Sequence, residues 1–197
     1  MPVGFIFLGL TLIYLLLFEN NITIKWIGSV FCFFTMCGYF VSPVNLCGVS
    51  ANIIFVVASI CMVCCFSFSL TLNQKVNVLI WSVFVSLAYV VLSTITSDYI
   101  TALNTYPVCF IILILCVINL KNFNFVVSFV QLSFLNINAC NLVVERGMGH
   151  INIASVEFFN LMIVMVFIIK LIMLCITNLK ILKRSRQWKR VFYGLLL

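Results

Sequence analysis

The chain has 197 residues, of which 65% are apolar and 8% are charged, and its formal net charge is +7. A soluble domain has roughly 45–50% apolar and about 25% charged residues. Eleven basic and four acidic side chains are too few to solubilise a globule of this size. The composition therefore excludes a water-soluble fold and predicts an integral membrane protein.

Seven apolar runs, each bounded by polar or turn residues, are predicted to be transmembrane helices. They cover residues 2–18, 23–41, 49–72, 76–96, 100–120, 123–144 and 153–178, and the longest connection covers residues 145–152. Within a bilayer the backbone forms only helices or closed barrels, and continuous apolar runs do not match the alternating pattern of a barrel strand. We expect an all-α, seven-helix membrane domain over residues 1–178, followed by a basic tail over residues 179–197.

The distribution of the cations predicts the orientation of these helices. With seven spans and the N-terminus outside, Lys25, Lys75 and Lys121 all fall on the cytoplasmic side, together with the basic tail. This arrangement agrees with the excess of Lys and Arg that membrane proteins carry on cytoplasmic segments. Removing one span would place several of these lysines on the wrong side.

The tail carries more than half of the basic residues and follows directly on the last apolar run. A nucleic-acid footprint would instead place a basic patch on a folded domain, so no nucleic-acid partner is expected. Trp188, Phe192 and Leu195 alternate with these cations, which is typical of a short interfacial helix on anionic lipid headgroups. The predicted headgroup contacts are Lys180, Lys183, Arg184, Arg186, Lys189 and Arg190.

The sixth run has an unusual number of polar side chains for a membrane helix. They are Asn124, Ser128, Gln131, Asn136, Asn138 and Asn141. All except Asn136 fall within about 140° of one helical face, so this face is expected to turn toward protein or water rather than lipid. Two interpretations remain open: interhelical hydrogen bonds that hold the bundle together, and a hydrated path at the middle of the membrane.

Two ionisable residues lie inside the seventh run, where charges are costly and are often functional. Glu157 lies near the outer end of the run, and Lys170 lies about 13 residues further along. At 100° per residue they point about 140° apart, so they cannot pair with each other. Lys170 could extend to the inner headgroups, face the interior as part of a polar path, or form a retinal Schiff base, although no counter-ion for that base lies within the first six runs.

No metal or cofactor site is expected from the ten cysteines and the single His150. Cys61, Cys64 and Cys65 have ligand-like spacing, but no second matched pair and no nearby histidine accompany them. We interpret the thiols as small buried apolar groups and His150 as a solvated loop residue. No catalytic residue is predicted, because an acid–base pair near the middle of the membrane is absent.

The last three runs resemble the hydrogenase-4 membrane component E family over roughly residues 108–176. The stretch Leu115-Cys116-Val117-Ile118-Asn119-Leu120-Lys121-Asn122-Phe123 looks like that family's helix end and basic-Asn loop, and Ile163-Val164-Met165-Val166 is similar to part of its last helix. The resemblance implies a multi-pass bacterial plasma-membrane protein whose last three helices are like the small three-helix membrane-arm subunit of respiratory complex I. It also implies other integral membrane subunits as partners.

The chain departs from the family pattern at two acidic positions. The family's penultimate helix carries a carboxylate where this chain reads Phe134-Leu135-Asn136-Ile137, and its last helix carries one near Asn160, where this chain has the amide. The resemblance therefore implies a non-catalytic subunit of an oxidoreductase complex. This subunit would support proton or cation coupling that its neighbours perform. The polar-path candidates are Gln131, Asn138, Asn141, Glu157, Asn160 and Lys170. The alternative is a seven-helix sensor that acts through a separate cytoplasmic partner.

Overall fold

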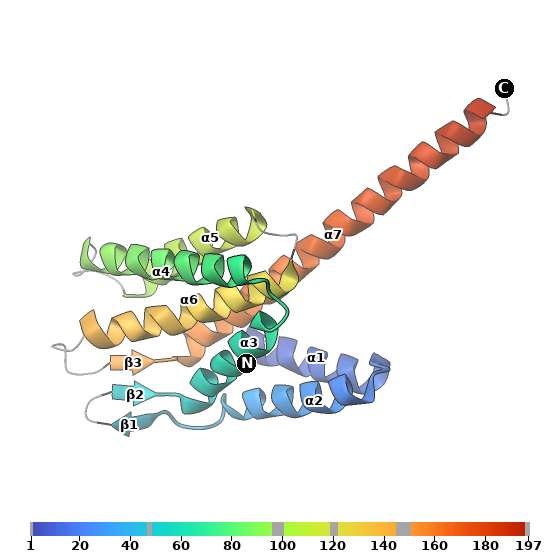
Figure 1. Cartoon of the computed structure of the whole chain (residues 1–197). Coiled ribbons are helices and arrows are strands. Elements are labelled where there is room, and N and C mark those ends of the chain that lie inside the picture. The colour runs from blue at the N-terminus through green and yellow to red at the C-terminus, as the bar shows by residue number, and fades with distance from the viewer. Residues whose placement is uncertain (1, 47–48, 96–100, 119–121, 145–150, 196–197) are drawn as a thin grey trace.

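The computed structural model describes residues 2–46, 49–95, 101–118, 122–144 and 151–195. Within these ranges the chain forms seven helices and three short strands. The helices are α1 (Val3–Phe18), α2 (Ile22–Cys37), α3 (Ile53–Ser67), α4 (Leu72–Ile95), α5 (Thr101–Ile118), α6 (Phe123–Val144) and α7 (Val156–Leu195). The predicted all-α fold is confirmed (Figure 1), and each helix overlaps one of the seven apolar runs.

The helices begin where polar side chains can bond the free N–H groups of a first turn. Asn21 accepts from the N–H groups of Thr23 and Ile24 at 3.1 and 3.3 Å, and Asn122 does the same before α6. Before α4, Thr71 and Gln74 form a reciprocal capping box, in which each side chain accepts from the other residue's N–H. Short polar connections therefore set the helix boundaries within an almost uniformly apolar sequence.

Of the described helices, three are long and apolar enough to cross a membrane. The candidate spans are Leu72–Leu92 in α4, Phe123–Leu142 in α6 and Val156–Ile176 in α7. Helices α1, α2 and α3 are apolar but have only 15 or 16 residues, which corresponds to about 24 Å of rise against a hydrocarbon core of about 30 Å. The chain thus has the helical, apolar construction of a membrane protein.

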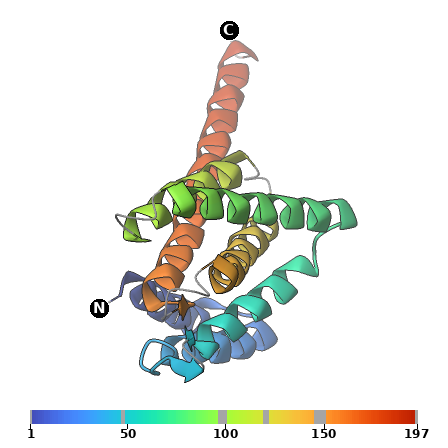
Figure 2. The same ribbon diagram turned by 90° about the vertical axis from the view of Figure 1, so that its left-hand side faces the viewer.

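Helix α6 occupies the centre of the bundle. It packs against α3, α4 and α7, and Figure 2 shows it enclosed by these helices when the bundle is viewed from the side of the sheet. The candidate span of α6 is more than half buried, whereas those of α4 and α7 are largely exposed. The least apolar of the three candidate spans is therefore also the most buried.

A three-stranded sheet joins segments that are far apart in the sequence. Strand β1 (Val44–Leu46) pairs antiparallel with β2 (Val49–Ala51), and β2 pairs in parallel with β3 (Ile151–Ile153). The sequence prediction was wrong here, because residues 49–51 and 153 were assigned to helices. Asn52 ends this extended segment: its side chain donates to the Gly38 carbonyl at 2.8 Å and accepts from the Phe55 N–H, so α3 begins only at Ile53.

Helix α7 continues well past its apolar part. The backbone remains helical to Leu195, so the 40 residues of α7 span about 60 Å. The C-terminal half of α7 leaves the bundle and projects beyond it (Figures 1 and 2). The basic tail is thus helical and continuous with the last candidate span.

Candidate functional site

The polar face of α6 faces neighbouring protein, as predicted, and Ser128, Gln131 and Asn138 are all buried. At the beginning of α6 this face bonds to the end of α3 and to the connection that follows it. Asn124 Nδ2 donates to Ser69 Oγ at 2.7 Å, and Ser67 Oγ donates to Ser128 Oγ at 3.2 Å. These bonds support the interpretation of α6 as a source of interhelical hydrogen bonds.

Near the end of α6, Asn138 joins the helix to the segment that enters α7. Its Oδ1 accepts from the backbone N–H of Ala154 at 2.8 Å, and its Nδ2 donates to the Phe134 carbonyl at 2.7 Å. Ala154 is fully buried and has a φ of 50°, a left-handed conformation that is unfavourable for a residue with a Cβ. Asn138 thus stabilises the turn between β3 and α7.

Between these two bonded ends lies Gln131, which has no hydrogen-bond partner. Its side chain is fully buried, and neither Oε1 nor Nε2 bonds to any described residue. Gln131 is about 12 Å from the start of a helix about 33 Å long, so it lies toward the middle of the candidate span of α6. A buried, unpaired amide costs roughly 1–3 kcal/mol, so this position needs a functional or structural explanation.

A cluster of three phenylalanines locates Gln131 in the bundle. Phe55 of α3 and Phe134 of α6 both contact Phe159 of α7, with ring centroids 4.1 and 5.7 Å from that of Phe159. The Ser67–Ser128 and Asn138–Ala154 bonds show that α6 runs antiparallel to both α3 and α7. Ser59 of α3 and Gln131 of α6 therefore lie about one helical turn from the cluster, on the side away from the sheet.

Ser59 shares the unusual state of Gln131. It is fully buried, and its Oγ has no partner among the described residues. At the same level α7 contributes the buried Met162 and Ile163, which offer no strong hydrogen-bonding group. We call Ser59 and Gln131, which lie at the same level of the bundle without bonding each other, the central polar site.

The central polar site can both donate and accept hydrogen bonds. The Gln131 amide provides two N–H donors and one carbonyl acceptor, and the Ser59 hydroxyl provides one donor and one acceptor. Such a mixed set matches water, which satisfies both kinds of group. It does not match a bare metal cation, which requires several oxygen ligands and no N–H group. Neither side chain exchanges protons by itself, so any proton passage here would proceed through water.

A second polar group lies where α1 meets α7. The Gly4 N–H donates to Asn160 Oδ1, and the Tyr39 hydroxyl, which is buried without a partner among the described residues, lies beside Gly4. Tyr39 also makes an edge contact with Phe55, with ring centroids 5.0 Å apart. Asn160 is half-buried and so lies within the protein, but it serves as a contact between helices.

The two ionisable candidates lie on the outer surface of the bundle. Glu157 and Lys170 are both exposed, and neither faces the central polar site. Lys170 Nζ lies 4.3 Å from the centroid of the Phe123 ring at the start of α6, which is cation–π geometry. This position agrees better with extension toward the inner headgroups than with a role in the interior.

The remaining candidates have differing positions. Asn141 is half-buried near the end of α6. The six tail cations, Lys180, Lys183, Arg184, Arg186, Lys189 and Arg190, lie on the helical extension of α7. His150 and Cys47 lie outside the described residues. Within the described part, no three His, Cys, Asp or Glu side chains come together as a metal site would require, and Cys61, Cys64 and Cys65 are exposed on α3.

Sequence reasoning missed Ser59 and Tyr39. A signal for Ser59 was present, because it is the only hydroxyl-bearing residue in the apolar stretch of residues 53–66. Nothing in the sequence marks Tyr39, since its surroundings come from α1, α3 and α7.

Comparison with known proteins gave no relative: no family model matches the chain, and neither a curated protein nor a solved structure resembles it significantly.

Proposed function

We propose that this chain is a non-catalytic integral membrane subunit that supports proton or cation coupling within a larger assembly. The observation that carries the proposal is the unpaired amide of Gln131, which is buried in the middle of the central helix. An apolar side chain would fill the same space without the desolvation cost of a buried amide. The amide is therefore best explained by a water molecule that it binds there. The proposal includes seven membrane spans with the N-terminus outside, in a bacterial plasma membrane.

The distribution of charge supports an accessory role rather than independent pumping. Both acidic and basic candidates of α7, Glu157 and Lys170, are exposed, and the described interior holds uncharged polar groups. A proton pump needs a group in its path that changes protonation state. In this proposal the neighbouring subunits supply that group, and the present chain supplies hydration beside it.

The exposed surface supports residence among other membrane proteins or lipid. Helices α1, α2 and α4 carry many large apolar side chains that the bundle leaves uncovered, such as Leu17, Trp26 and Ile80, each more than half exposed. The resemblance to hydrogenase-4 component E suggests which partners to expect, namely antiporter-like and hydrogenase membrane subunits. That assignment is part of the proposal.

The first experiment is purification of the tagged chain from its native membrane in mild detergent, with mass spectrometry of the proteins that accompany it. The proposal expects antiporter-like or hydrogenase subunits in stoichiometric amounts. Recovery of a lone monomer at several detergent concentrations would contradict the proposal.

The second experiment tests the central polar site in that assembly. Gln131→Met should lower proton flux into proteoliposomes several-fold while leaving the subunit composition intact. Ser133→Ala is the matched control, because Ser133 is also buried and unpaired but lies on the opposite face of α6. Equal flux in the wild type and Gln131→Met would remove the coupling role and leave the assembly result standing.

A second candidate function, a sensor that signals through a cytoplasmic partner, has one observation in its favour. Helix α7 connects the buried aromatic cluster at Phe159 to a helical arm outside the bundle without a break. A continuous helix can transmit a rotation or a shift from one end to the other. Co-purification of a kinase or another regulator in place of membrane subunits would favour this function.

A further inference from the structure

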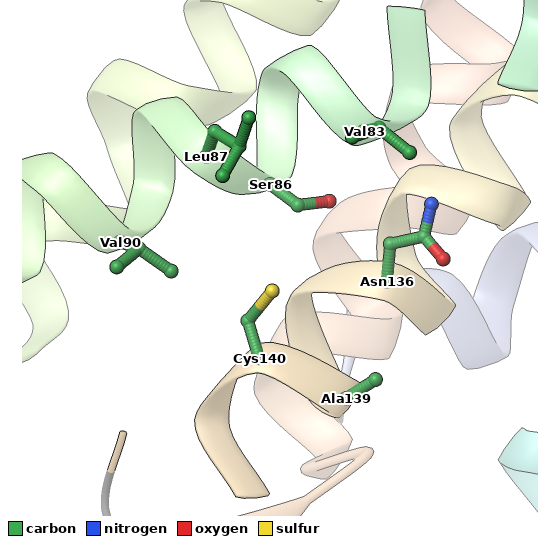
Figure 3. Close-up of a pocket in the computed structure, with 7 residues that line it drawn as sticks. All are labelled: Val83, Ser86, Leu87, Val90, Asn136, Ala139 and Cys140. Atoms are coloured by element: carbon green, nitrogen blue, oxygen red, sulfur yellow. The ribbon is translucent and has the colours of Figure 1, made fainter. Parts of the chain in front are cut away.

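A groove with a volume of about 450 Å³ lies between α4 and α6, away from the central polar site. It is lined by Val83, Ser86, Leu87, Val90, Asn136, Ala139 and Cys140 (Figure 3). The two helices are close together at Val83 and Asn136 and lie further apart at Val90 and Cys140. The side chains of Ser86 and Cys140 point into the space between them. This volume is within the range of about 300–1,000 Å³ that is typical of small-molecule sites.

The few polar groups of the lining are already bonded within the protein. Asn136 Nδ2 donates to Ser82 Oγ at 3.0 Å, and Ser86 Oγ donates to the Ser82 carbonyl at 2.7 Å. The other lining groups are aliphatic side chains and one thiol, which bonds weakly. An occupant of this groove therefore gains contact area rather than hydrogen bonds, which favours a hydrocarbon over a polar ligand.

The surroundings of the groove also identify the source of the hydrocarbon. Both helices that form it are long and apolar enough to cross a membrane. Two apolar lining residues of α4, Val83 and Leu87, are themselves 44% and 58% exposed. A surface of this kind faces lipid tails rather than water. The molecules that meet the groove are therefore those of the bilayer.

The length of the groove corresponds to about two-thirds of one leaflet. From Val83 to Val90 the helix rises about 10 Å, and one leaflet contributes about half of a hydrocarbon core of about 30 Å. We propose that the groove between α4 and α6 binds one acyl chain of a bilayer lipid, held longer than the lipids that cover the rest of the surface. This site is separate from the central polar site and does not depend on the coupling role.

The test places the full chain in phosphatidylcholine nanodiscs that contain a small fraction of phosphatidylcholine with a photoreactive diazirine in one acyl chain. After illumination, mass spectrometry maps the labelled residues. Labelling should concentrate several-fold on residues 83–90 and 136–140 over α1, where Leu17 is at least as exposed as the groove residues. Labelling that follows exposure alone would overturn the proposal, and so would an unlabelled groove, because another part of the chain would then fill it.

A matched pair of variants sharpens this test. Ala139→Phe adds bulk to the groove and should lower its labelling several-fold, whereas Leu142→Phe changes an exposed residue of the same helix outside the groove. Unchanged groove labelling in folded Ala139→Phe would count against the site. If Ala139→Phe does not fold, the distribution of label in the wild type decides the question by itself.

Discussion

Phe55 of α3 stacks face to face on Phe159 of α7, with ring centroids 4.1 Å apart and ring planes within 6° of parallel. Both rings are fully buried, and Phe134 and Tyr39 pack against the same pair. The stack connects α3 in the first half of the chain to α7, the last helix, beside the central polar site. It is therefore one of the contacts, together with the Ser67–Ser128 and Asn138–Ala154 hydrogen bonds, that position α3, α6 and α7 relative to one another.

Replacement of Phe159 by alanine should destabilise the bundle. An aromatic pair contributes roughly 0.5–1.5 kcal/mol beyond its buried area, and the cavity left behind adds to the loss. The apparent melting temperature in detergent should fall by several degrees. Phe33→Ala is the control, since Phe33 is 64% exposed on α2 and should change the melting temperature little. Equal effects of the two substitutions would contradict a structural role for the stack.

Gly4 and Gly9 of α1 should respond in opposite directions to alanine. A Cβ on Gly4 would lie 2.5 Å from Asn160 Oδ1 and 2.6 Å from the Tyr39 hydroxyl, so Gly4→Ala should push α1 away from α7 and lower the melting temperature. A Cβ on Gly9 would meet only Met36 Cε, at 3.9 Å. Gly9→Ala should therefore stabilise α1 by about 0.5–1 kcal/mol through helix propensity. Thermal unfolding of the two variants, side by side, tests the close contact between α1 and α7.

Asn138→Leu should destabilise the turn that leads into α7. The substitution leaves the buried N–H of Ala154 without an acceptor, which costs roughly 1–3 kcal/mol. Hydrogen exchange of the Ala154 amide should accelerate, and the melting temperature should decrease. Asn141→Leu, one turn later on the same helix, serves as the control; if it were equally damaging, the loss would reflect polarity in general and not this bond.

Gln131→Met should raise the stability of the isolated chain. Because the Gln131 amide is buried without a partner, an apolar side chain of similar length removes a desolvation cost of about 1–3 kcal/mol. The melting temperature in detergent should increase even as proton flux in the assembly decreases. A decrease in stability would contradict the unpaired state of the Gln131 amide in the isolated chain and would indicate that water is already bound to it there.

The basic extension of α7 should respond to anionic lipid. Each Lys or Arg near a negatively charged membrane contributes about 1 kcal/mol of attraction. In proteoliposomes, trypsin should cut residues 180–190 more slowly with phosphatidylglycerol present than in pure phosphatidylcholine, and high salt should abolish the difference. Cleavage that is independent of lipid charge would indicate that the arm stays clear of the surface.

The seven helices could be predicted because each apolar run is interrupted by polar residues that cap helices. Asn21 and Asn122 mark boundaries that the structure keeps, whereas Thr71 was predicted to lie inside the third run and instead caps α4. The strands could not be predicted in this way, because Val49, Ala51 and Ile153 continue apolar runs and hydropathy does not distinguish a short strand from a helix end. The polar face of α6 could be predicted from the sequence. That Gln131 on this face lies at the same level as Ser59 could not, because it depends on how α3, α6 and α7 align.

The parallel pairing of Val49 with Ile151 has a consequence for how the chain is made. The central strand cannot acquire its second neighbour until about 100 further residues have left the ribosome, with α4, α5 and α6 already placed. Until then β2 has one exposed edge, and Asn138 has no Ala154 to bond. Closure of the sheet is thus a late step of biogenesis, and it locks the first half of the protein to the last helix.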